Sequence, residues 1–259
     1  MNRLFRTFFI FLLLLSTRSS FATSYDSQAE IKESRSNFAF KQSFSKNLDG
    51  LIAISTTSSS TVRQTSSDID RLYCQANAAQ IELSQLLASL NGAEYCELVL
   101  PAIKSYQRAA QKVATKFGGD ASQITDLARA SLVADDIYSL MIAYEDLSQK
   151  AKIVQVKNRF AVPKASGYRD LNLLVKLPQT QMIVEVQLHL KAISEIKNGE
   201  EHQVYETVQA IEASAKKQGR QLNDIEVAKI TQLRQQSHKL YHKAWLNYKR
   251  LDNASLIAA

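Results

Sequence analysis

Glycine and proline are scarce in this chain, and their scarcity favours long, uninterrupted helices. The 259 residues include only 7 glycines and 3 prolines. Both residue types destabilise the interior of a helix, so their low number predicts a helix-rich protein. With 45% hydrophobic residues, the chain is long enough for one or two domains with a real core.

The sequence also lacks the short motifs that most often signal a bound phosphate or metal. It has no Gly-x-x-x-x-Gly-Lys-Ser/Thr loop, no Gly-x-Gly-x-x-Gly fingerprint and no internal repeat. Its four histidines and two cysteines do not have the close spacing of a zinc site. Any phosphate-binding function must therefore use other residues.

The two cysteines are Cys74 and Cys96. Both fall in predicted helices that flank Asn91 and Gly92, so a helical hairpin could bring them together. In an oxidising compartment such a pair can form a disulfide. Two separate thiols fit the sequence equally well, because geometry decides and the sequence does not show it.

Residues 1–22 have the layout of a secretory signal peptide. Arg3 and Arg6 precede an apolar run from Thr7 to Leu15, and Ser20-Phe21-Ala22 forms a small-residue cleavage site. The run is short for a membrane span, although a membrane anchor or a buried helix is the alternative interpretation. Cleavage lowers the net charge from +7 to +4, because three arginines and no acid are removed. We expect an exported protein, periplasmic, secreted or delivered to another cell, without a membrane span after cleavage.

Residues 23–66 are rich in Ser, Thr and Asn and predict a flexible segment. A globular domain is expected at 67–251. Its hydrophobic periodicity predicts helices at about 68–90, 97–117, 136–151, 190–217 and 222–251. Strands are expected at about 124–135 and 152–160, with two more within 163–191. This order predicts an α+β fold in which a mixed sheet of about four or five strands is covered by helices.

The segment Met182–His189 alternates in an unusual way. Successive strand side chains point to opposite faces, so Met182, Val184, Val186 and Leu188 share a face suited to a core. The opposite face then carries Glu185, Gln187 and His189 in line. An ordinary solvated face is one interpretation, and a face that lines a ligand site is the other.

A basic stretch precedes this strand. In KNRFAVPKASGYRD, the cations Lys157, Arg159, Lys164 and Arg169 surround the flexible Ser166-Gly167. Glycine beside lysine and arginine suits phosphate, and Tyr168 offers a flat face for a base. The alternative is a surface turn with solvated cations and a tyrosine at the edge of the core.

Asp126, with Arg129 close by, adds a second carboxylate at the start of the first predicted strand after the two N-terminal helices. Together with Glu185 it would place two carboxylates on neighbouring strands among several cations. Mg²⁺ is held by one or two carboxylates and takes its remaining ligands from water and phosphate oxygens. These residues therefore predict a site for Mg²⁺ and a polyphosphate.

Residues from about 104 to 212 resemble the RelA/SpoT synthetase domain of the alarmone (ppGpp) synthetases. The resemblance rests on an ordered series: ITDLAR, KNRFAVPKASGYRDLNLLV, VEVQLHLK and EEHQVYE. It implies transfer of pyrophosphate from ATP to the 3′-hydroxyl of a guanine or other nucleotide, with Mg²⁺ as cofactor. It also implies an Mg²⁺ pair of Asp126 and Glu185, activation of the 3′-hydroxyl by Glu185, support from Gln187, and acceptor contacts from Tyr168, Lys157 and Lys164.

The residues expected at the donor side are less well defined. Lys104, Arg108, Lys112 and Lys116 recur every four residues and form one basic helix face, which could hold the donor phosphates or face solvent. Arg129 and Arg169 complete the expected substrate-binding set. Glu201, His202 and Tyr205 match a closing helix of the family with a structural role.

The sequence departs from the family pattern at three places: Asp126 is followed by Leu-Ala-Arg without the usual glycine, Asn172 replaces a histidine, and His189 replaces an arginine. Three hypotheses therefore remain open. The chain is a divergent pyrophosphokinase that acts as an exported effector or toxin, a non-catalytic nucleotide- or RNA-binding module, or an envelope interaction protein whose long terminal helices carry the function.

Overall fold

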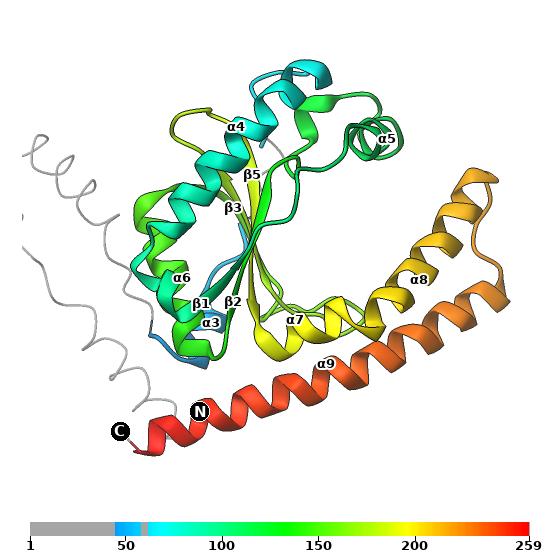
Figure 1. The fold of residues 1–259 in the computed structure, drawn as a ribbon. Coiled ribbons are helices and arrows are strands. Elements are labelled where there is room, and N and C mark those ends of the chain that lie inside the picture. Colours follow the sequence, from blue (N-terminus) through cyan, green and yellow to red (C-terminus); the bar gives the residue numbers. More distant parts are fainter. Residues whose placement is uncertain (1–44, 58–61, 259) are drawn as a thin grey trace, which may run out of the picture. The chain divides into compact units, whose positions relative to one another are not determined.

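The computed structural model describes residues 45–57 and 62–258. Within them, five strands form one mixed sheet in the order β1-β2-β5-β4-β3 (Figure 1). The strands are β1 (Cys96–Val99), β2 (Arg129–Ala134), β3 (Lys152–Asn158), β4 (Leu171–Lys176) and β5 (Ile183–Leu190). β2 and β5 pair in parallel, and the other pairings are antiparallel. The predicted α+β fold with a mixed sheet is confirmed.

Seven helices surround the sheet in the described residues. They are α3 (Leu48–Ala53), α4 (Ile69–Ala88), α5 (Tyr106–Lys116), α6 (Ile137–Lys150), α7 (Lys191–Asn198), α8 (Glu200–Lys217) and α9 (Asp224–Ala258). Short 3₁₀ turns lie at Asn91–Tyr95 and Ala121–Gln123. Figure 1 shows α4 and α6 on one side of the sheet, and α5 with the α8–α9 pair on the other. We call the face of the sheet that carries Glu185 and Gln187 of β5 the polar face.

The alternation in β5 is confirmed by its burial. Met182, Val184 and Val186 are fully buried, and Leu188 is 1% exposed, whereas Glu185 and Gln187 are only half-buried. A strand exposes every second residue to the same side, so one face of β5 joins the core and the other lines the polar face.

Two predicted helices begin where their capping residues stand. The Asp68 carboxylate accepts hydrogen bonds from the amides of Asp70 and Arg71 at the start of α4. The Asp136 carboxylate accepts from the amide of Ser139 at the start of α6. Such caps satisfy amides that the helix itself leaves unpaired, which fixes the first turn.

The predicted helix 97–117 was wrong in its first half. Residues Cys96–Val99 form strand β1, which pairs antiparallel with β2, and the helix begins only at Tyr106. Pro101 explains the difference, since it lacks an amide donor and biases the preceding residue towards extended backbone. The predicted helix 190–217 is likewise divided at Gly199, and β2 begins at Arg129 rather than 124.

Part of the predicted flexible segment 23–66 is folded, which corrects that expectation for residues 45–57 and 62–66. Leu51 and Ile54 are buried in the main core, at 0% and 2% exposure. The Gln64 amide donates to the carbonyls of Ile124 (2.8 Å) and Ile183 (2.7 Å) and accepts from the amide of Ile183. Low complexity concealed these contacts because they depend on residues about 60 to 119 positions away. The predicted signal peptide 1–22 lies outside the described residues.

Both cysteines are free thiols in the structure. Cys74 is exposed on α4 and Cys96 begins β1, so the helical hairpin that suggested a disulfide does not form. Within residues 45–57 and 62–258, no helix is both long enough and apolar enough to cross a membrane.

Candidate functional site

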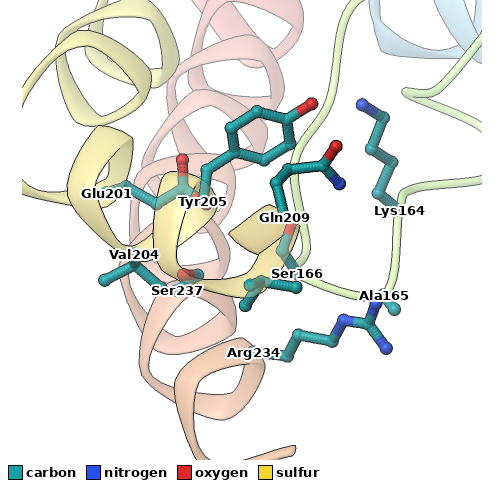
Figure 2. A pocket seen from close by; sticks show the side chains of 10 residues that line it. Lys164, Ala165, Ser166, Glu201, Val204, Tyr205, Gln209, Arg234 and Ser237 are labelled. Atoms are coloured by element: carbon teal, nitrogen blue, oxygen red, sulfur yellow. The ribbon is translucent and has the colours of Figure 1, made fainter. Parts of the chain in front are cut away.

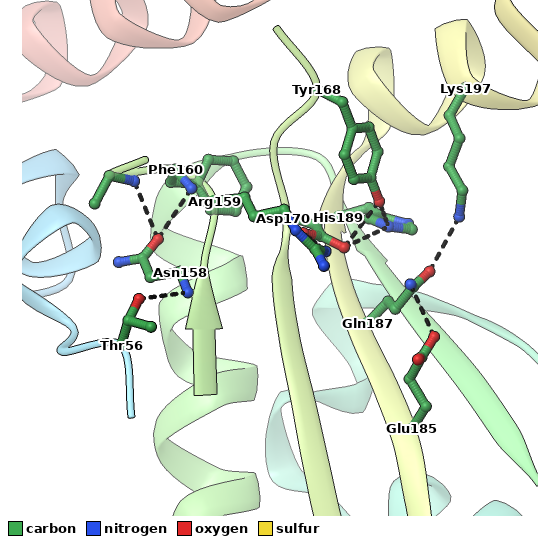
Figure 3. A network of polar contacts seen from close by, with 11 residues as sticks. Thr56, Asn158, Arg159, Phe160, Tyr168, Asp170, Glu185, Gln187, His189 and Lys197 are labelled. Atoms are coloured by element: carbon green, nitrogen blue, oxygen red, sulfur yellow. Dashed lines mark hydrogen bonds and ion pairs between the residues drawn. The ribbon is translucent and has the colours of Figure 1, made fainter. Parts of the chain in front are cut away.

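A row of hydrogen-bonded side chains lies along the polar face of β5 (Figure 3). The Gln187 amide nitrogen donates to Glu185 Oε1 over 2.9 Å. Lys197, from the last turn of α7, donates to Gln187 Oε1 over 3.1 Å. Burial lowers the pKa of the Lys197 ammonium. Gln187 therefore holds both the carboxylate and the cation in place, which fits the supporting role expected from the resemblance.

Deeper in the same face, Tyr168, Asp170 and His189 form a buried network (Figure 3). The Tyr168 hydroxyl lies 2.8 Å from Asp170 Oδ2 and 2.9 Å from His189 Nε2. Because a carboxylate only accepts, the hydroxyl donates to Asp170 and is left to accept from His189. This arrangement requires a proton on His189 Nε2, which for a neutral ring is the Nε2–H tautomer.

The charges around this network are consistent with that tautomer. Burial lowers the pKa of His189, so its ring is neutral at pH 7. Burial raises the pKa of Asp170, but the His189 ring nitrogen, 3.8 Å away, and the Arg159 guanidinium, which donates over 2.7 Å, together outweigh burial and hold the pKa below its ordinary value. Burial and Asp170 raise the pKa of Tyr168. The network thus consists of one carboxylate, one guanidinium and two neutral rings.

Asp126 forms a second polar cluster just before β2. Its Oδ2 accepts from Lys112 over 2.8 Å and lies 3.2 Å from the Lys104 ammonium. Burial raises the pKa of Asp126, but the two lysines outweigh burial and keep the pKa below its ordinary value. Its other oxygen, Oδ1, is buried and has no hydrogen-bond partner in the described part of the chain.

The strand register aligns β5 with the strand that begins just after Asp126. Arg129, three residues after Asp126, lies directly opposite Glu185 in the parallel β2–β5 pairing. The Glu185 amide donates to the carbonyl of Ala128. Asp126 itself lies before β2 and outside this register, so a site formed by two carboxylates on neighbouring strands stays a prediction.

The remaining basic residues have different environments. Lys112 and Lys104 bind Asp126, whereas Arg108 and Lys157 are exposed. The Nε atoms of Arg129 and Arg169 are buried without a partner among the described residues. Arg169 stacks on Trp245 at 4.9 Å and donates to the carbonyl of Phe160, and burial lowers its pKa. Their roles in substrate binding stay predictions.

A tight turn positions Lys164 over Tyr168. The Gly167 amide donates to the Lys164 carbonyl over 2.7 Å, and Gly167 adopts φ +82°, which glycine tolerates without strain. The Lys164 ammonium lies 5.1 Å from the centre of the Tyr168 ring, which is only 7% exposed. Stacking of a base on Tyr168 stays a prediction, and it requires Lys164 to leave this ring face.

Two residues of the site had no signal in the sequence. Lys197 follows the end of β5 by seven residues, about two helical turns, and Asp170 stands in an ordinary Tyr-Arg-Asp run. Periodicity could not identify either residue, because their importance depends on hydrogen bonds to Gln187 and Tyr168. His189, which the pattern left without a role, is explained as the hydrogen-bond donor to Tyr168.

The residues at the polar face fit a magnesium ion better than a transition metal. Within the described residues, no three His, Cys, Asp or Glu side chains gather as a protein-only metal site. Mg²⁺ does not need such a cage, because it takes most of its ligands from water and phosphate. Asp126 Oδ1, which has no partner among the described residues, and the Glu185 carboxylate are oxygen ligands of the kind that Mg²⁺ prefers, and their pairing on one ion stays a prediction.

Comparison with known proteins gives a fold and no sequence family. No family model and no curated protein matches the chain. The chain is similar to the Type VI effector Tas1, solved with its immunity protein, at TM-score 0.50 and 19% identity over 67% of this chain and 94% of that chain.

Two small alarmone synthetases from Bacillus subtilis are also similar. Synthetase 1, bound to its product pppGpp, gives TM-score 0.49 and 18% identity over 73% of this chain and 98% of that chain. Synthetase 2 gives TM-score 0.47 and 22% identity over 70% and 95%. At such identities, structural likeness establishes a shared fold alone, and here that statement rests on the Type VI effector.

Proposed function

We propose that this protein is a RelA/SpoT-like pyrophosphokinase that transfers pyrophosphate from ATP to the 3′-hydroxyl of a guanine or other nucleotide. The observation that carries the proposal is the polar face of β2 and β5. There, Gln187 donates to Glu185 and accepts from Lys197, and the segment before β2 carries the Asp126 carboxylate, of which one oxygen has no partner among the described residues. The ordered series of motifs in the sequence supports the same activity.

In this proposal, Asp126 and Glu185 hold Mg²⁺, which when bound offsets the negative charge of the phosphates. The 3′-hydroxyl oxygen forms a bond to the β-phosphorus of ATP. The bond from that phosphorus to the oxygen that bridges the α- and β-phosphates breaks, and AMP leaves with the bonding electrons. Glu185 accepts the proton of the hydroxyl. Such transfers depend mainly on positioning and electrostatics.

Cations around the face provide that electrostatic support. Lys104 and Lys112 already lie within 3.2 Å and 2.8 Å of Asp126, so an arriving polyphosphate would meet them beside the metal. We assign them, with Arg108 and Arg129, to the donor phosphates. Lys157, Lys164 and Arg169 are assigned to the acceptor side, near Tyr168.

The proposal is tested by incubating the purified protein with Mg²⁺, γ-labelled ATP and GDP, GTP or ADP. We expect label to move to an acceptor, and Glu185→Gln to abolish transfer without loss of folding, because Glu185 is half-buried and outside the apolar core. Asp135→Asn, an exposed carboxylate, is the matched control and should retain activity. A folded protein that transfers no label to any acceptor contradicts the proposal.

A non-catalytic nucleotide-binding module is the second candidate. It is favoured by the two lysines that pair with Asp126, since they compete with a metal for the same carboxylate. Binding of nucleotide without any transfer would support it. RNA can be included among the acceptors, and retention of labelled RNA without turnover would assign the module to RNA instead.

We also propose that the chain is exported, on the strength of the signal-like layout of residues 1–22. Delivery into another cell would give an exported pyrophosphokinase access to ATP. Fractionation of cells that produce the full chain, compared with a variant in which Leu12, Leu13 and Leu14 are replaced by Asp, measures this directly. Retention of both proteins in the cytoplasm would contradict export.

A further inference from the structure

A cavity of about 340 Å³ lies beside the Lys164–Gly167 turn, between this turn and helices α8 and α9 (Figure 2). Its volume falls within the range of small-molecule sites. The residues that line it and matter below are Lys164, Glu201, Tyr205, Val208, Gln209 and Arg234. Apart from Lys164, none of them belongs to the substrate-binding set expected from the sequence.

One wall of the cavity offers a planar ring above an apolar floor. Tyr205 of α8 is 48% exposed and lines the cavity, and Figure 2 shows its ring standing away from the helix. Val208, one turn further along α8, is buried beneath it and packs with Ile230 and Leu233 of α9. An exposed aromatic face over an apolar floor suits stacking with a flat ring.

Two cations stand at the same cavity on different elements. Lys164 comes from the turn and Arg234 from α9. Arg234 uses NH2 to bind Glu212 over 2.7 Å, and its guanidinium has further N–H donors. The carboxylate of Glu201 already accepts from the Tyr241 hydroxyl over 2.9 Å. The cavity therefore presents positive charge together with a carboxylate that already has a partner.

Lys164 connects the cavity to the polar face of the sheet. Its ammonium interacts electrostatically with Glu185 and Asp170 on the sheet side and with Glu201 on the α8 side. Lys164 thus both lines the cavity and places its ammonium 5.1 Å from the centre of the Tyr168 ring, so an anionic group that meets Lys164 has room for its remaining atoms in the cavity.

We propose that this cavity binds the acceptor nucleotide, with its base on Tyr205 and its 5′-phosphates between Lys164 and Arg234. The inference rests on the proposed function and assigns acceptor residues that the sequence did not. Gln209 faces the same space and offers an amide to the edge of the base. The base then lies on the α8 side of Lys164, and Tyr168, tied to Asp170 and His189, stays a buried support.

The test measures binding of labelled diphosphate nucleotide by equilibrium dialysis without ATP, using GDP or ADP, whichever the wild-type protein binds more tightly. Tyr205→Ala should weaken binding about tenfold, because stacking on an aromatic ring is lost. Tyr138→Ala is the matched control, since Tyr138 is similarly exposed, at 54%, on the distant helix α6. Circular dichroism confirms that each variant is folded.

The Arg234→Gln variant distinguishes binding of the phosphates from binding of the base. It should weaken binding of the diphosphate about tenfold and leave binding of the corresponding nucleoside unchanged, because only the charge contact is removed. Arg220→Gln is the matched control, since Arg220 is also paired with a glutamate over 2.7 Å but lies outside the cavity. Tyr205→Phe should retain binding, because the ring remains.

Three outcomes overturn the inference. The first is wild-type affinity in both Tyr205→Ala and Arg234→Gln. The second is loss of binding in Tyr168→Leu alone, which would assign the base to Tyr168. The third is that the folded wild-type protein binds neither diphosphate. Failure of the proposed function gives a different result. Binding that depends on Tyr205 and Arg234, without any transfer of label, contradicts the activity and leaves the cavity assignment intact.

Discussion

The polar face of the sheet and the cavity at α8 and α9 lie side by side but are held in different ways. On the sheet, Glu185, Gln187 and His189 are fixed by the backbone register of β5 with its two neighbours. At the cavity, Tyr205 and Arg234 stand on helices whose own apolar cluster has three buried members, Val208, Ile230 and Leu233. The residues proposed for chemistry therefore sit on the better-supported region.

This difference bears on how the two regions should respond to change. Helices with few buried apolar contacts open at lower free energy than core strands. The cavity can adjust to a ligand while the carboxylates remain in place. The predictions below contrast the two regions, from the largest expected effect to the smallest.

The buried network should show the largest effect. Asp170→Ala removes a fully buried carboxylate and leaves the Arg159 guanidinium without its partner at 2.7 Å. We expect a loss of about 3–5 kcal/mol in the free energy of unfolding, as for other broken buried pairs, measured by urea denaturation. Tyr168→Phe, which removes one hydroxyl, should cost only about 1–2 kcal/mol. Equal losses of stability in Asp170→Ala and Tyr168→Phe would show that the Asp170–Arg159 ion pair does not stabilise the network.

Shortening one buried apolar side chain in each region should show directly how the stability of the two regions differs. Leu173→Ala, in the sheet core at 0% exposure, should cost about 2–5 kcal/mol of global stability. Ile230→Ala, at 3% exposure in the small cluster, should cost less globally. It should instead speed amide hydrogen exchange in α8 and the first half of α9, measured by mass spectrometry. Uniformly faster exchange in the sheet as well would contradict the contrast.

The Asp126 cluster predicts a pH dependence. Because its folded-state pKa is depressed, the ionised carboxylate stabilises the protein above its unfolded pKa of about 3.9, and this stability is lost as the pH falls through the folded-state value. Asp126→Asn should therefore cost about 1–2 kcal/mol at pH 7, with a difference from wild type that shrinks below about pH 3.9. Asp135→Asn, in an exposed pair with Lys191, should change stability by less than about 0.5 kcal/mol. A pH-independent cost at Asp126 would contradict the electrostatic explanation.

A substitution at Gly167, where the Lys164–Gly167 turn meets α9, should give the smallest effect on stability. Gly167 has φ +82°, and a methyl group there would meet His238 at 3.1–3.2 Å and Tyr241 at 3.4 Å. Gly219 has φ +65° with open space around it. Gly219→Ala should cost about 1 kcal/mol from backbone strain alone, and Gly167→Ala slightly more. If Gly167→Ala and Gly219→Ala lowered stability equally in thermal unfolding, α9 would be able to move away from the turn without an energetic cost.

The sequence predicted the parts of the fold that depend on local patterns. The periodicity of α4 and α6 and the alternation in β5 each depend on residues within one element. Strand β1 and the folded part of residues 45–66 were missed, because both depend on pairing with distant segments: β1 with β2, and Thr57 with Val156.

The candidate site divides in the same way. The pattern indicated Asp126, Glu185 and Gln187, since an acidic residue or an amide in an apolar strand is conspicuous in the sequence. Lys197, Asp170 and Arg234 were not indicated, because each stands in a polar stretch of ordinary composition. Their environments depend on tertiary contacts to Gln187, Tyr168 and the α8 cavity.

Helix α9 meets the rest of the protein at widely separated points, from Arg234 at the cavity through Tyr241 beside Tyr168 to Asp252, which accepts from the amide of Leu48. A chain leaves the ribosome with its N-terminal part first. During synthesis, the segment that carries Asp126 and the strand that carries Glu185 emerge before α9 exists. A nascent chain therefore displays its carboxylates before the helix that completes the neighbouring cavity has been translated.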